Sequence, residues 1–149
     1  MATAWDKYQE LVKEEMSKLY SQTVIDHALN PRNVGNTGAA NGYASVTGPC
    51  GDTMDIWLMV KNDTIVKATF MTDGCGTTVA AGSMVTELAK DKSVSQALRT
   101  SQEDVLSALE GLPEESKHCA LLAANTLRAA AKDYLTLKNE PWKRAYKRP

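Results

Sequence analysis

The three cysteines of the chain stand far apart, and their neighbours suit an accessible thiolate better than a buried side chain. The local sequences are Pro49-Cys50-Gly51-Asp52, Gly74-Cys75-Gly76 and Lys117-His118-Cys119. Glycines beside two of them let the backbone pass close to a bound ion. A carboxylate and an imidazole stand near the first and the third. This set of donors predicts a metal or cluster site.

The spacing of the cysteines excludes the small zinc motifs. Intervals of 25 and 44 residues separate them, whereas zinc fingers and ribbons bring their ligands in close pairs. A folded domain must therefore gather these ligands. Three cysteines without close pairs also fit a reducing compartment better than a disulfide framework.

Length and composition predict a single soluble domain. The chain has 149 residues, of which 43% are hydrophobic and 23% are charged, enough to form a sizeable core. A net charge of −1 provides no electrostatic attraction for nucleic acid. No apolar run approaches the ~18 residues of a membrane span. Asp6, Glu10, Glu14 and Glu15 argue against a secretory or mitochondrial leader. We therefore expect a cytoplasmic protein without nucleic-acid or membrane partners.

Hydrophobic periodicity predicts three strands, at 43–47, 53–60 and 65–72. In the second, Met54, Ile56, Leu58 and Val60 alternate with Asp55, Trp57 and Met59. Asn62-Asp63 is a turn signal that makes the last two strands antiparallel.

The pattern changes to a helical period after Gly76. Thr77 or Thr78 is a candidate cap for the first helix, and the pairs Ser93 with Gln96 and Ser101 with Asp104 are typical helix starts. A long helix is predicted over 117–135. The expected fold class is α+β, a small three-stranded antiparallel sheet with helices packed on one face.

Two terminal segments flank the predicted domain, 20–135. Residues 1–19 predict an amphipathic helix, which either stays on its own domain or in solvent, or docks on a partner or a second subunit. Docking on a second subunit would give a homodimer. The tail, 136–149, has five basic residues and one acidic residue from Lys138 onward. We expect a solvated tail, with docking on an acidic partner as the alternative.

The predicted elements also place the cysteines. Cys75 falls just before one helix, and Cys119 falls in the first turn of another if Ser116 is its cap. A helix N-terminus favours negative charge and lowers the pKa of a thiol. Cys50 lies on a loop before the strand at Thr53. Three separate elements are therefore expected to bring their thiols to one end of the sheet, at the surface.

Several segments resemble iron–sulfur cluster assembly scaffolds of the IscU/NifU N-terminal type. Tyr20 to Gly35, reading YSQTVIDHALNPRNVG, is similar to the family's opening segment, and the three cysteine motifs follow in the family's order and at about its spacing. The resemblance runs from about Tyr20 to Tyr134. It implies Cys50, Cys75 and Cys119 as ligands, with His118, Asp52 or an exogenous group as candidates for a fourth place. His27 is interpreted as structural.

The resemblance implies a scaffold rather than an enzyme, with no catalytic residues of its own. Sulfur would arrive as a persulfide from a cysteine desulfurase, ferrous iron would join it, and a donor such as a ferredoxin would supply electrons. The resulting [2Fe–2S] cluster would pass to recipient apo-proteins. Three thiolates and a weaker fourth ligand would hold it less tightly than four cysteines.

One departure concerns a partner. Many family members carry Leu-Pro-Pro-Val-Lys before the last cysteine, a sequence that a DnaK-type chaperone reads. This chain has Leu112-Pro113-Glu114-Glu115-Ser116 instead. Two acidic residues replace the second proline and the valine, and this change argues against that chaperone as a partner.

Two alternatives belong to other classes. Zn²⁺ would accept the same three thiolates with Asp52 or His118 in a tetrahedron, as in a zinc-bound sulfur acceptor that activates a desulfurase. A thiol enzyme with His118 as base to a cysteine is the other. Adjacent helical residues point about 100° apart and no third group is evident to orient the base, so the sequence disfavours the enzyme.

Overall fold

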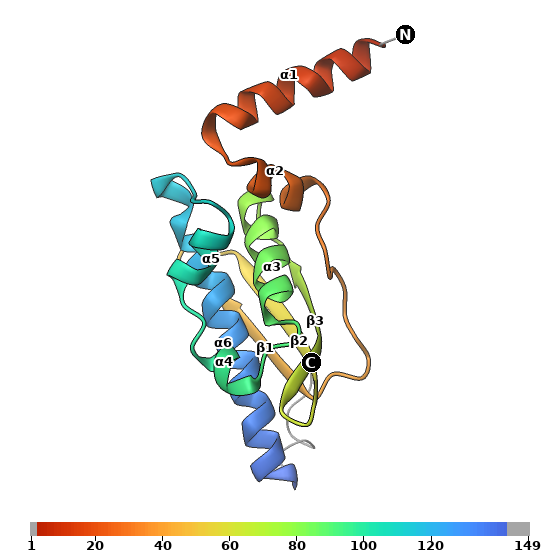
Figure 1. Cartoon of the computed structure of the whole chain (residues 1–149), viewed down its shortest axis with the longest axis vertical. Helices are drawn as coiled ribbons and strands as arrows, with labels where there is room; N and C mark the ends of the chain where they lie inside the picture. Colours follow the sequence, from red (N-terminus) through yellow and green to blue (C-terminus); the bar gives the residue numbers. More distant parts are fainter. Residues whose placement is uncertain (1–2, 143–149) are drawn as a thin grey trace.

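The computed structural model describes residues 3–142 and shows helices on one face of a three-stranded antiparallel sheet (Figure 1). The strands are β1 (Gly42–Thr47), β2 (Thr53–Lys61) and β3 (Thr64–Thr72), in the order β1-β2-β3. Asn62 and Asp63, with φ of 53° and 59°, form the tight turn between β2 and β3. The predicted α+β fold is confirmed.

The alternation in β2 decides which face of the sheet is covered. Met54, Ile56, Leu58 and Val60 are at most 5% exposed and contribute to the core beneath α3 (Gly76–Ala89) and α6 (Lys117–Asn139). Figure 1 shows both helices along the same side of the sheet. The helix α6 extends four residues beyond the predicted end at 135, because no helix-breaking residue precedes Pro141.

Two short helices begin where the sequence predicts them. In α4 (Val94–Leu98) the capping box joins Ser93 and Gln96, and in α5 (Gln102–Ala108) it joins Ser101 and Asp104. A short 3-10 helix, η1 (Glu114–Ser116), then leads into α6. The sequence did not predict η1.

The helix α2 (Gln22–Leu29) packs on α3 through a polar contact. His27 is 8% exposed, and its Nδ1 lies 2.7 Å from Ser83 Oγ. The backbone N–H of Arg32 donates to the same oxygen at 2.9 Å. One hydroxyl of α3 thus binds both α2 and the segment that follows it, which agrees with a structural role for His27.

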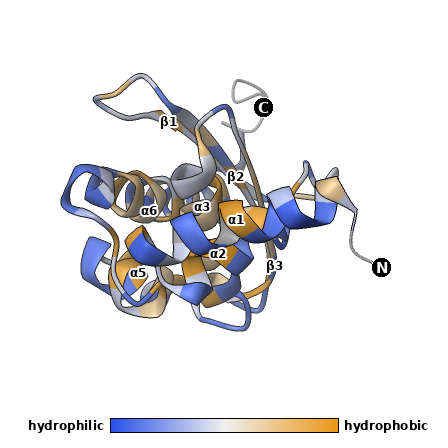
Figure 2. Ribbon diagram, turned by 90° about the horizontal axis from the view of Figure 1, so that it is seen from above, coloured by the Kyte–Doolittle hydropathy of each residue, from blue (hydrophilic) through white to orange (hydrophobic). Residues whose placement is uncertain are grey.

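The helix α1 (Ala4–Leu19) projects from the end of the domain where α2 lies (Figure 1). Trp5, Tyr8 and Leu19 are 64%, 58% and 67% exposed, and Figure 2 shows hydrophobic residues along this helix among hydrophilic ones. The side chain of Met16 and residues 143–149 of the basic tail lie outside the described residues. Within residues 3–142, no helix is both long and apolar enough to cross a membrane.

Candidate metal and cluster site

Cys50 stands at the tip of the β1–β2 loop. The Gly48 N–H donates to Asp52 O at 2.8 Å, and the Gly51 N–H donates to Gly48 O at 3.0 Å. Gly51 has a φ of 91°, which side chains rarely adopt. This tight loop leaves the Cys50 thiol exposed and puts Asp52, half-buried, directly before β2.

Hydrogen bonds join the start of β2 to the end of β3. The Thr53 N–H donates to Asp73 Oδ1 at 2.8 Å, and the Thr72 hydroxyl donates to Thr53 O at 2.7 Å. The Gly74 N–H donates to Thr72 Oγ1 at 3.1 Å. The loop that carries Cys50 and Asp52 is therefore fixed next to the loop that carries Cys75.

Cys75 is exposed and is itself the N-cap residue of α3. The prediction that Thr77 or Thr78 caps this helix is wrong, because both hydroxyls turn to sulfur and carboxylate groups instead. The Thr77 hydroxyl, 3.2 Å from Cys75 Sγ, is the main cause that lowers the pKa of Cys75. The backbone N–H groups of Thr78 and Thr77 lower it further, against an opposing effect of partial burial. The direction of the pKa shift agrees with the prediction, but the hydroxyl of Thr77 contributes more to it than the N–H groups at the helix N-terminus.

Cys119 differs from the prediction. It lies in the first turn of α6 after Ser116, as expected, but its side chain is 1% exposed and belongs to the hydrophobic core. Burial raises the pKa of Cys119 above its ordinary value, although hydrogen bonds from Thr77 and Thr78 oppose this. The expectation of an accessible, acidified thiol is therefore wrong for Cys119, because desolvation of the thiolate outweighs the local hydrogen bonds.

Two threonines that the sequence analysis read only as caps connect the site. Thr77 Oγ1 lies 3.2 Å from Cys75 Sγ and 3.4 Å from Cys119 Sγ. Thr78 Oγ1 lies 3.3 Å from Cys119 Sγ and donates to Asp52 Oδ2 at 3.0 Å. No local sequence signal predicts these contacts, because Asp52 and Cys119 are far from both threonines in the chain.

His118 and Cys119 turn toward one another. The imidazole Nε2 lies 3.7 Å from Cys119 Sγ, so the angular separation of adjacent helical residues does not keep the two groups apart. This contact does not activate Cys119 as the nucleophile of a thiol enzyme, because the thiol is buried and its pKa is raised.

The structure thus places all five predicted site residues at one end of the sheet. Cys75, Cys119 and Asp52 are linked by the two threonines, His118 adjoins Cys119, and Cys50 is close enough for its charge to raise the pKa of Cys119, after larger effects of burial and Cys75. Among residues 3–142, no three His, Cys, Asp or Glu side chains are yet arranged around a common ion position. A shared ion therefore requires rotation of side chains or closure of the β1–β2 loop.

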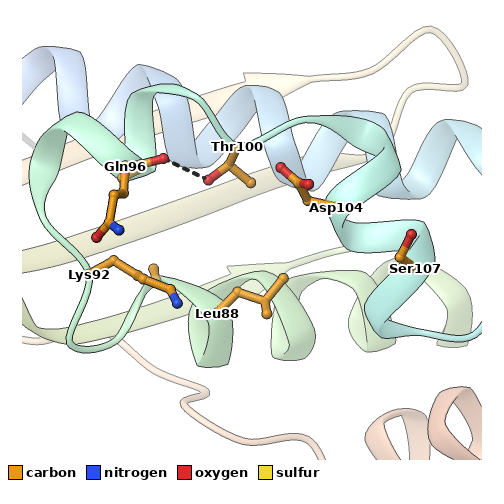
Figure 3. Close-up of a pocket in the computed structure, with 8 residues that line it drawn as sticks. Leu88, Lys92, Gln96, Thr100, Asp104 and Ser107 are labelled. Atoms are coloured by element: carbon orange, nitrogen blue, oxygen red, sulfur yellow. Dashed lines mark hydrogen bonds between the residues drawn. The ribbon is translucent and has the colours of Figure 1, made fainter.

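Two pockets are lined by residues other than the cysteines. One, of about 320 Å³, lies between α3, α4 and α5 (Figure 3). Two of its polar side chains are already engaged, because Gln96 and Asp104 accept the N-cap N–H groups of Ser93 and Ser101. The other, of about 270 Å³, adjoins Asp73 and the Thr53 contact described above. Neither pocket contains a cysteine.

Fold and site together define a small α+β domain whose thiols converge from two helices and a loop. A family model described as the NifU-like N terminal domain matches residues 19–141. The chain belongs to this family.

Named relatives agree with this assignment. Iron-sulfur cluster assembly scaffold protein IscU 1 of Archaeoglobus fulgidus is 45% identical over 117 residues, 78% of this chain and 76% of that protein. The scaffold protein IscU of Escherichia coli K12 is 42% identical over 120 residues, 77% and 93% of the two chains. The solved NifU-like N-terminal structure from Brucella abortus has a TM-score of 0.64 at 16% identity, covering 80% of this chain and 96% of that one, and so supports the fold.

Proposed function

We propose that this chain is a scaffold on which an iron–sulfur cluster is assembled before transfer to other proteins. The observation that carries the proposal is the meeting of Cys75 and Cys119 around the same two hydroxyls, with Cys50 and Asp52 on the adjoining loop. Thiolates are soft donors that suit iron–sulfur clusters. Relatives that cover most of the chain are named as such scaffolds.

Cys75 is the residue best suited to accept sulfur. It is exposed and its pKa is lowered, so more of it is thiolate near neutral pH. A thiolate attacks the outer sulfur of a desulfurase persulfide and releases the desulfurase thiolate. The transferred sulfur must still gain two electrons to become sulfide, which is the role of an electron donor such as a ferredoxin.

We propose that the cargo is a [2Fe–2S] cluster held by Cys50, Cys75 and Cys119. Four protein ligands complete two tetrahedral irons, so His118 or Asp52 takes the fourth place. A nitrogen or oxygen donor binds a soft cluster less firmly than a thiolate. That weakness suits a protein that gives its cluster away to apo-proteins.

Glu114 and Glu115 bear on which partners take part. Both are exposed on η1, and Glu114 pairs with Lys117 at 2.8 Å. This acidic surface is unlike the Pro-Val pair of the chaperone-read sequence. We therefore propose transfer without a DnaK-type chaperone.

A zinc-bound sulfur acceptor is the competing function, because Zn²⁺ would accept the same three thiolates with Asp52 or His118 as the fourth donor. Purified protein separates the two functions. Colour with bound iron and sulfide supports the scaffold. A colourless zinc protein that stimulates a desulfurase supports the alternative.

Anaerobic reconstitution with ferrous iron, cysteine and a cysteine desulfurase tests the scaffold. Visible and Mössbauer spectra should show a [2Fe–2S] cluster in the unaltered protein. Serine at position 50, 75 or 119 should sharply lower the iron and sulfide content, because an alkoxide is far harder to form than a thiolate. Full retention in one variant would remove that cysteine from the ligand set, and failure of the unaltered protein to assemble any cluster would overturn the proposal.

A further inference from the structure

Thr78 lies where the three parts of the site meet. Its side chain is completely buried, and its hydroxyl donates to Asp52 Oδ2 at 3.0 Å. The same oxygen lies 3.3 Å from Cys119 Sγ and 3.8 Å from Cys75 Sγ. One hydroxyl of α3 therefore contacts the β1–β2 loop and both helix thiols.

The Thr78 side chain fills the space beside Gly74. A Cβ at Gly74 would lie 2.6 Å from Thr78 Cβ and 2.7 Å from its Oγ1 and Cγ2. The Thr78 side chain therefore occupies the space that any larger residue at position 74 would need. A β-branched side chain in a helix also has few rotamers, and the one that Thr78 adopts points its hydroxyl at Asp52.

A hydroxyl has a single hydrogen to donate. Here it points to the Asp52 carboxylate, and Cys119 Sγ lies 3.3 Å from the same oxygen. Carboxylates that bind metals are generally held in place by hydrogen bonds of their own. The bond from Thr78 to Asp52 Oδ2 is a bond of this kind.

We propose that Thr78 is a positioning residue that tethers the Asp52 carboxylate beside the thiols. The tether is a property of the protein without metal. Its consequence for the cargo, a cluster that is released more readily, rests on the proposed scaffold function. The two parts can be tested separately.

The tether is tested in metal-free protein by hydrogen exchange at the Gly48 and Gly51 amides, which are bonded within the loop. Thr78→Val keeps the shape and removes the hydroxyl, so exchange there should rise about tenfold to a hundredfold, as the loss of a hydrogen bond to a charged group predicts. Thr78→Ser should restore slow exchange. Thr126→Val is the matched control, because Thr126 is equally buried and its hydroxyl donates only to Leu122 O within α6. Unchanged exchange in Thr78→Val would overturn the tether.

The consequence is tested by a double-mutant cycle on the reconstituted protein, with decay of the visible absorbance as the readout. Thr78→Val should slow cluster loss by about the same factor as Asp52→Ala, and should have no further effect when Asp52 is already alanine. An equal effect of Thr78→Val in both backgrounds would mean that Thr78 acts through Cys119, and would refute the proposal. Absence of a cluster in every variant would count against the scaffold function, and the exchange experiment would still decide the tether.

Discussion

At the scale of single residues, the two helix thiols have opposite chemistry. Cys75 is exposed with a lowered pKa, whereas Cys119 is buried with a raised pKa. The difference arises from the surroundings of each side chain. The Thr77 hydroxyl and the backbone N–H groups of Thr77 and Thr78 favour the thiolate of Cys75, the N-cap residue of α3, whereas burial disfavours the thiolate of Cys119.

The order in which the thiols react follows from this difference. In metal-free protein at pH 7, iodoacetamide should modify Cys75 well before Cys119, because the thiolate is the reacting form and the pKa of Cys75 is the lower. As pH is lowered, alkylation of Cys75 should still be measurable at pH values where alkylation of Cys119 is no longer detected. Mass spectrometry of the alkylated peptides measures both rates. Faster modification of Cys119 would contradict the buried placement of that thiol.

Asp52 is predicted to make the loaded site labile. A carboxylate is a hard donor that can be protonated, and its negative charge beside an anionic cluster raises the energy of the loaded state. Asp52→Ala should therefore lose its cluster more slowly, by roughly three- to tenfold for a contact of about 1 kcal/mol. Loss in air and delivery to an apo-ferredoxin, both followed by visible absorbance, give the measurement. Equal or faster loss in Asp52→Ala would show that this carboxylate does not labilise the cluster.

At the scale of elements, the sequence predicted what depends on local pattern. The alternation in β2, the turn at Asn62-Asp63 and the capping boxes at Ser93 and Ser101 all follow from residues that are near one another in the chain. The predicted site residues were also placed on the right elements. The burial of Cys119 was not predictable in this way, because it depends on how α6 packs against α3.

Contacts between elements explain what the sequence left out. Thr77 and Thr78 join α3 to Cys119 on α6, residues separated by about 40 positions. The face of a helix that receives a distant side chain is set by packing, and periodicity reports only that the face is buried. The sequence does not predict the close approach of α3 to β3 at Gly82 either, because a single glycine within a helix does not change the hydrophobic periodicity.

The approach of α3 to β3 can be tested at Gly82. A Cβ there would lie 2.5 Å from Phe70 Cδ2 and 2.6 Å from its Cε2, and the ring is 1% exposed, so it has little room to move. Gly82→Ala should lower the free energy of unfolding by about 1–3 kcal/mol, the usual cost of overpacking. Gly38→Ala is the control, since nothing lies within 4 Å of the added methyl. Urea unfolding compares the two, and equal midpoints would contradict the close packing.

At the scale of the whole molecule, His27 couples the fold to pH. Burial, followed by the charge of Arg32, lowers the pKa of His27, while Asp26 and Glu87 oppose the shift. The unfolded chain therefore takes up a proton first as pH falls below about 6.5. Because this proton stabilises the unfolded chain, the free energy of unfolding falls by at most about 1.4 kcal/mol per pH unit for one group. The contribution is complete above pH 6.5 and is lost as pH falls toward the pKa in the folded protein.

The pH effect is measured with His27→Asn, whose amide can bond Ser83 and does not titrate in this range. Urea midpoints at pH 7.5, 6.0 and 5.0 should fall less steeply in the variant than in the unaltered protein. His118 and the carboxylates remain in both proteins, so the difference between the two curves isolates His27. Parallel curves would show that His27 is not the group responsible.

The helix α1 is predicted to contribute almost nothing to the stability of the domain. Its described apolar side chains are exposed, none of its residues belongs to the hydrophobic core of the described chain, and its ion pair, Lys18 with Glu15, lies within the helix itself. A chain that begins at Tyr20 should therefore change its free energy of unfolding by less than about 0.5 kcal/mol. Leu127→Ala, in the core beneath the sheet, provides the comparison and should cost about 2–5 kcal/mol. Urea unfolding of the three proteins decides: a loss above about 1 kcal/mol on removing α1 would show that this helix packs on its own domain in solution. A change of less than about 0.5 kcal/mol in the free energy of unfolding would show that the apolar face of α1 does not stabilise the domain. Trp5 and Tyr8, whose ring centroids stack at 5.8 Å, lie on this helix.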